Sequence, residues 1–119
     1  MLSKQRFQEA ACLETGTNSI AIGGHAGVTQ GNTALAIGNL SGRNQSANAI
    51  AIGSYAGNGG AGAGSQATGA VAVGVAAGAN QGQNAVAFGR EAGGSGNSSP
   101  DLQGANSVAI GYRAGFNGL

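Results

Sequence analysis

A four-residue pattern of apolar residue, alanine, apolar residue and glycine recurs six times along the chain. The copies begin at Ile20, Leu35, Ile50, Val71, Val86 and Val108 and end at Gly23, Gly38, Gly53, Gly74, Gly89 and Gly111. Strict alternation is typical of a β-strand, in which successive side chains point to opposite faces. Repetition at a short period predicts stacked coils, each of which buries its apolar face against the next.

The period follows from the glycines that end the copies, which are 15, 15, 21, 15 and 22 residues apart. A glutamine precedes each of the last five copies at a constant distance, and these residues are Gln30, Gln45, Gln66, Gln81 and Gln103. The first copy has Thr15 at the corresponding place. The extra residues therefore lie before Gln66 and Gln103. The sequence predicts a 15-residue coil with insertions of six and seven residues near 58–65 and 94–102.

Fifteen residues leave room for two short strands and two tight corners. We therefore predict an all-β fold, a parallel β-solenoid or narrow β-roll of six coils over residues 15–119. Stacking places the first apolar residue of each copy in one column. The second apolar residues form another column, which consists of Ile22, Ile37, Ile52, Val73, Phe88 and Ile110. The glycines are expected at corners where no side chain fits. The glutamines are expected to form an amide ladder, with polar turn residues as the alternative.

The alternation leaves open which face points inward. With the Ile and Val columns inside, a monomer could be stable. With the alanines inside, twelve large apolar side chains would form an outer strip that requires partners. The narrow coil favours the second arrangement and a homo-oligomer.

Composition and charge exclude several classes of function. The chain contains five Lys and Arg residues and four Asp and Glu residues. The resulting net charge of +1 gives no basis for nucleic-acid binding. The single Cys12 excludes a disulfide within the chain. No stretch is apolar enough for membrane insertion, and no signal peptide is visible, so the sequence does not indicate a route of export.

No residue set points to an enzyme, a metal or a cofactor. The only histidine, His25, occupies a corner position at which the other copies have unrelated residues, and we interpret it as a solvated side chain. A calcium-binding roll would need repeated aspartates, but Asp101 is the only one. We expect no catalytic, metal or cofactor-binding residues.

The segment Asn48-Ala49-Ile50-Ala51-Ile52-Gly53, with Ala56 after it, resembles the head repeats of trimeric autotransporter adhesins. The resemblance covers residues 15–119 and implies a trimeric, left-handed parallel β-roll. The chain is also similar to glycine-rich tandem-repeat fibre proteins of phages and large DNA viruses. It departs from the adhesins in its period of 15 rather than 14 residues.

The two ends of the chain suggest an assembly. Residues 1–14 differ from the repeats, and we expect a cap or docking segment there, with a short helix that Ser3 begins. The last coil ends near Leu119 without a cap, and an uncapped strand edge is a template for another chain. The main hypothesis is a self-assembling filament or virion appendage, extracellular, in which Phe7 and Leu13 pack on Phe116 and Leu119 of the next subunit.

Two other functions are considered. The alternative is a trimeric adhesin or tail-fibre head that binds a receptor or glycan through the insertion loops. Ice binding suits a flat solenoid, but the threonines form no regular row, and this hypothesis is the least favoured.

Overall fold

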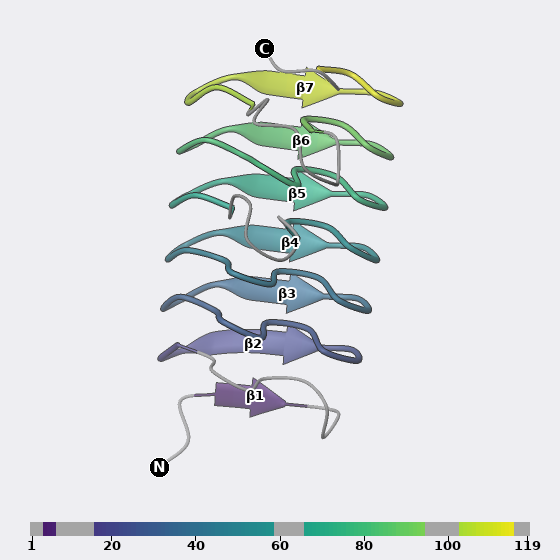
Figure 1. Ribbon diagram of the computed structural model, residues 1–119. Coiled ribbons are helices and arrows are strands. Elements are labelled where there is room, and N and C mark those ends of the chain that lie inside the picture. The colour runs from purple at the N-terminus through teal and green to yellow at the C-terminus, as the bar shows by residue number, and fades with distance from the viewer. Residues whose placement is uncertain (1–3, 7–15, 59–65, 95–102, 116–119) are drawn as a thin grey trace.

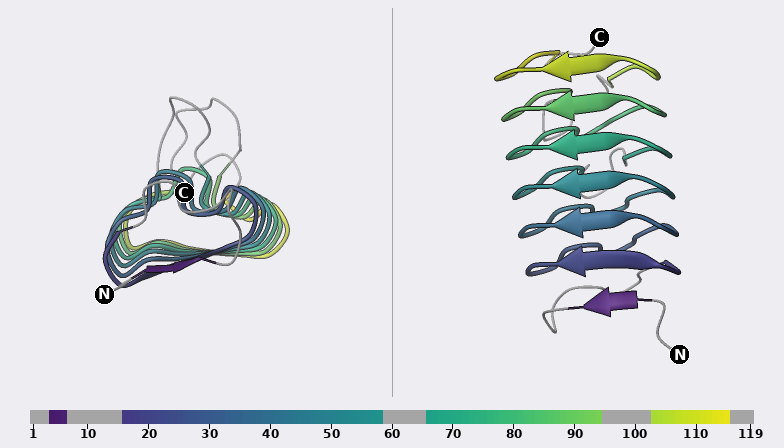
Figure 2. Two further views of the ribbon diagram at one scale, coloured as in Figure 1. Left: turned by 90° about the horizontal axis from the view of Figure 1, so that it is seen from below. Right: turned by 180° about the vertical axis from the view of Figure 1, so that it is seen from behind.

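The computed structural model describes residues 4–6, 16–58, 66–94 and 103–115. These residues form one sheet of seven strands in chain order (Figure 1). The strands are β1 (Lys4–Arg6), β2 (Ser19–Ile22), β3 (Leu35–Ile37), β4 (Ile50–Ile52), β5 (Val71–Val73), β6 (Val86–Phe88) and β7 (Val108–Ile110). Figure 2 shows the coils stacked behind one another in a flattened outline. The predicted all-β parallel solenoid is confirmed.

All neighbouring strands are parallel and in register. Ala36 pairs with Ala51, and Ala51 pairs with Ala72 on the next strand. The second pairing crosses the first insertion without a shift. The first apolar residues, the alanines and the second apolar residues of successive coils therefore stand opposite one another along the stack. The two predicted insertions, near 58–65 and 94–102, largely lie outside the described ranges.

Each coil contains one strand rather than the two that we expected. On the opposite side of the roll, the pairing is reduced to single bridges between successive glutamines, such as Gln30 with Gln45 and Gln66 with Gln81. Tight turns on both sides of each bridge leave no room for a longer ladder there. The second side of the roll is therefore held by backbone bridges and by the glutamine side chains.

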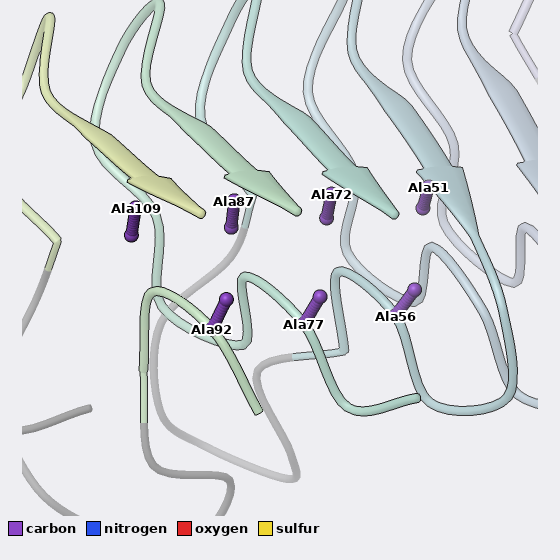
Figure 3. Close-up of a cluster of buried hydrophobic side chains, with 7 residues drawn as sticks. All are labelled: Ala51, Ala56, Ala72, Ala77, Ala87, Ala92 and Ala109. Atoms are coloured by element: carbon purple, nitrogen blue, oxygen red, sulfur yellow. The ribbon is translucent and has the colours of Figure 1, made fainter. Parts of the chain in front are cut away.

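The alanine columns lie inside the roll. Ala51, Ala72 and Ala87 on the strands have no exposed surface, and Ala56 and Ala77 on the opposite turns have none either. Figure 3 shows the two sets pointing toward each other across the interior. Because successive side chains of a strand point to opposite faces, the Ile and Val side chains on either side of each buried alanine point outward. The question that the alternation left open is thus settled.

The glycine that ends each of the strands β2 to β6 lies where a side chain would collide with the next coil. Gly53 has a φ of +127°, and a Cβ built on it would lie 2.7 Å from the carbonyl oxygen of Gly74. Carbon and oxygen cannot approach so closely, and this backbone region is essentially restricted to glycine. Glycine is therefore required at these strand ends for two independent reasons, the positive φ and the close approach of the next coil.

The N-terminal segment differs from our expectation. Lys4–Arg6 form strand β1, which pairs in parallel with β2, with Lys4 opposite Ser19. The helix predicted from Ser3 is therefore wrong over these residues. The exposed edge of β2 offers backbone groups that an extended segment can satisfy, and this pairing outweighs a weak local helix preference. The segment extends the sheet by one strand beyond the six repeats.

Candidate assembly surface

The outer face of strands β2–β7 consists of the two columns of Ile, Leu, Val and Phe side chains. We call this the apolar face. Its strand positions carry no charged or polar side chain, because each strand of the repeat reads apolar, alanine, apolar. Six strands at a spacing of about 4.8 Å make it roughly 24 Å long. A continuous apolar surface of this kind is unusual on a monomer and marks a site of interaction.

Exposure on the apolar face is greatest at its C-terminal end. Ile37, Ile52 and Val73 are half-buried because the side chains above and below in the same column cover them. On β7, Val108 is 59% and Ile110 67% exposed. β7 ends the sheet in the described residues, so its side chains are covered from one side only. The columns therefore pack against themselves but leave their outer surface to solvent.

A ladder of glutamines lies buried behind this face. The Nε2 of Gln30 donates to Oε1 of Gln45 at 3.2 Å, Gln45 donates to Gln66 at 3.0 Å, and Gln66 donates to Gln81 at 3.2 Å. Buried amides of this kind need such partners, since an unsatisfied polar group costs about 1–3 kcal/mol. The ladder does not continue to Gln103, whose Oε1 is buried without a hydrogen-bond partner among the described residues.

The same glutamines fasten the strands that carry the apolar face. Each Nε2 also donates to the carbonyl oxygen of the first apolar strand residue, as Gln30 does to Ile20 and Gln66 to Ile50, at distances of 2.9 and 2.6 Å. The corresponding bonds of Gln45, Gln81 and Gln103 are 2.9, 2.7 and 2.8 Å long. The apolar face is thus supported from behind at every coil from β2 to β6. A rigid support of this kind favours a preformed contact surface.

The remaining predicted site residues are not brought into this surface. Phe7, Leu13, Phe116 and Leu119, the expected assembly ends, lie outside the described residues. His25 is exposed at a corner. No group of three or more potential metal ligands occurs among the residues that the structure describes. Within the same ranges, no helix has the length and apolar character required to cross a membrane.

One feature of the corners was not apparent from the sequence. The second residue after each strand glycine has a left-handed backbone, with φ between 56° and 62°. These residues are His25, Leu40, Tyr55, Ala76, Glu91 and Arg113. Glycine or asparagine would have indicated such a backbone, but neither occurs there. The asparagine-rich column was a usable signal, because Asn18, Asn48, Asn84 and Asn106 all have φ near +60°.

Comparison with known families agrees with this geometry. The YadA head domain repeat matches the chain in two copies, over residues 15–41, 65–92 and 103–114, which together are more than half of the chain. The matched residues contain β2, β3, β5, β6 and β7 and leave out nearly all of both insertions. The match therefore rests on the repeats themselves. No curated protein and no solved structure matches the chain.

Proposed function

Since the chain belongs to the YadA head domain repeat family, we propose that it is the head module of a surface adhesin. Its copies associate side by side through the apolar face into a trimer, and the assembly works outside the cell. The family favours this alternative over the filament. The residues on which the filament hypothesis depended lie outside the described ranges, whereas the matched repeats contain five of the six strands of the apolar face. The proposed role is structural and adhesive rather than enzymatic.

The observation that carries the proposal is the orientation of the two side-chain columns. Alanine fills the interior, so the side chains with the most apolar surface point to solvent, and Ile20, Phe88 and Ile110 are 37, 53 and 67% exposed. Burial of apolar surface contributes about 25 cal/mol per Å². A face that is one roll wide and continuous along the stack matches the same face of another copy. A closed trimer would cover this face in every subunit.

Sedimentation velocity of the purified chain tests this function. We expect a species of three times the 11.3 kDa chain mass. Ile52→Asp places a charge at the centre of the apolar face and should yield monomers. Ile52→Thr keeps a β-branched residue in the strand and should weaken the trimer at least tenfold, because it removes apolar surface.

The matched control is Gln83→Asp, which adds a charge at an exposed corner and should leave the trimer intact. Circular dichroism must show that each variant keeps its β-structure. A folded monomer at high concentration, or an unchanged trimer in Ile52→Asp, would overturn the proposal. Polydisperse, fast-sedimenting filaments that Ile52→Asp does not affect would favour the axial assembly instead.

A further inference from the structure

The corner that follows each strand carries a different pair of residues in every coil. One member of each pair is the left-handed residue described above. The residue before it completes the pair, and these residues are Gly24, Asn39, Ser54, Val75, Arg90 and Tyr112. We call the two columns together the corner ridge. The strand positions and the two glycine positions repeat the same residue types from coil to coil, whereas the positions of the corner ridge do not.

The left-handed residues of the corner ridge are costly for the fold. A side chain in this conformation costs roughly 1–2 kcal/mol relative to a right-handed one, and glycine avoids most of that cost. The chain uses glycine at the next left-handed position in all six coils, for example at Gly27 and Gly57, where a Cβ would meet an alanine and a glutamine. At the left-handed position of the ridge, by contrast, none of the six residues is glycine or asparagine. Strain that persists where glycine would relieve it indicates a function other than folding.

The corner ridge also gathers the reactive and charged side chains. Between residues 16 and 115, the described ranges contain seven His, Tyr, Arg and Glu residues. Six of them lie on the ridge, and these are His25, Tyr55, Arg90, Glu91, Tyr112 and Arg113. Arg43 is the exception. Of the four charged residues within these ranges, three therefore lie on one edge of the roll.

The part of the ridge beside β4–β7 has a defined chemistry. Glu91 is held between Arg90 and Arg113, with Nε–carboxylate distances of 3.6 and 3.2 Å. Two guanidinium groups and one carboxylate leave a local charge of +1. Tyr55 is 48% and Tyr112 68% exposed on the same ridge. These four coils span about 15 Å along the stack at 4.8 Å per coil.

We propose that the ridge segment from Tyr55 to Arg113 is the contact surface for an extended, acidic segment of a partner protein. The inference deepens the proposed adhesive function and rests on it. Tyrosine and arginine dominate the energetics of protein–protein contacts. Val75, which is 49% exposed, adds an apolar contact that a sulfated glycan could not use well. The fixed carboxylate of Glu91 would also repel a dense polyanion, whereas a peptide with spaced carboxylates can approach the arginines.

Biolayer interferometry on the assembled protein tests this surface, with an alternating glutamate–tyrosine copolymer, whose carboxylates are spaced by tyrosines, as the probe. We expect binding that weakens as salt is raised, because the contact is partly electrostatic. Tyr112→Ala and Arg90→Ala should each weaken binding at least tenfold. Arg43→Ala removes the same charge away from the ridge and should change binding less than twofold.

The outcomes distinguish this inference from the trimer. If the copolymer does not bind, or if Tyr112→Ala and Arg90→Ala bind it as the unchanged protein does, the ridge is not a peptide surface. If heparin binds more tightly than the copolymer with the same residue dependence, the partner is an anionic glycan and the proposal is wrong. Sedimentation of both variants should show the same oligomer as the unchanged protein. A changed oligomer would make the ridge a contact between copies and would also overturn the proposal, while the apolar-face test stands separately.

Discussion

Gln45 donates a hydrogen bond from Nε2 to Oε1 of Gln66 at 3.0 Å, although 21 residues separate the two along the chain. The equivalent bond from Gln30 to Gln45 spans 15 residues. The glutamine ladder therefore continues from Gln45 to Gln66 although the first insertion separates them in the sequence. Register in this fold is defined by the buried contacts, and the number of residues between them is free to vary.

A charged residue in the ladder tests this role. Gln66→Glu removes the donor to Ile50 and Gln81 and places a carboxylate beside their oxygens. The buried charge would keep the Gln45 amide as a donor but would face the oxygens of Ile50 and Gln81 without a proton between them. It should lower the free energy of unfolding by about 3 kcal/mol or more at pH 7. Burial raises the pKa of the introduced carboxyl in the folded state. The folded state then binds more protons than the unfolded state, so the loss should shrink as pH falls from 7 toward 4.

The matched control for the ladder is Gln83→Glu, the same substitution at an exposed corner. It should change the free energy of unfolding by no more than about 0.5 kcal/mol. Urea denaturation at pH 7 and pH 4 measures both variants. Equal losses in the two, or a loss in Gln66→Glu that grows toward pH 4, would show that the ladder does not support the fold.

The strand-end glycines give a second prediction. Gly53→Val combines a forbidden backbone angle with a clash against the carbonyl of Gly74. We expect it to destabilise the chain by more than about 2 kcal/mol, because a strained backbone angle alone costs about 1–3 kcal/mol. Ser54→Val, at the next residue, should cost less than about 1 kcal/mol. Thermal denaturation of the two variants compares them directly, and similar melting temperatures would contradict the argument.

The width of the interior gives a third prediction. Ala72 is fully buried between neighbouring alanines, so Ala72→Val must push the two sides of the roll apart. Overpacking of this kind costs typically about 1–3 kcal/mol. Val73→Ile adds one methylene on the apolar face, in a column that already contains Ile52, and should be nearly neutral. If urea denaturation shows Val73→Ile to be the more harmful variant, the inside and outside of the roll have been assigned incorrectly.

The sequence predicted the stack well because its repeats are in phase with the structure. The position of a residue within its repeat copy predicts the column to which it belongs. The pairing of Ala51 with Ala72 therefore follows from counting residues along the chain. It could not decide whether Ala51 or Ile52 points inward, because alternation is symmetric. The width of the space inside the coil determines which side chains point inward. That width depends on how the whole coil closes, and the alternation along one strand does not contain it. The left-handed backbone of Glu91 was also invisible, since neither its type nor its neighbours indicate that angle.

The N-terminal strand could not be predicted for a related reason. Lys4–Arg6 carry no apolar alternation, and their extended backbone depends on the edge of β2. The intrinsic secondary-structure preference of these three residues is weak, and pairing with β2 determines their extended conformation. The single-residue bridges at Gln30 and Gln45 belong to the same class, because the tightness of the turns limits their length.

The independence of register and loop length leads to the last prediction. Deletion of residues 60–65 leaves Gly57, Asn58 and Gly59 directly before Gln66, in the same spacing as Gly42, Arg43 and Asn44 before Gln45. Asn44 has a left-handed backbone with φ of 58°, a conformation that glycine adopts readily at the matching position. The shortened coil should therefore close without strain, with a 15-residue period across β4 and β5.

The expected change in the free energy of unfolding is within about 1 kcal/mol, since doubling a loop costs only about 0.6 kcal/mol. Deletion of residues 47–52 removes the same number of residues but includes strand β4. It should prevent cooperative unfolding of the coils that follow β4 in the chain. Circular dichroism with urea denaturation measures both deletions. If deletion of residues 60–65 lowers the free energy of unfolding as much as deletion of residues 47–52 does, the insertion is part of the folding unit. The 15-residue coil would then not be the unit of the fold.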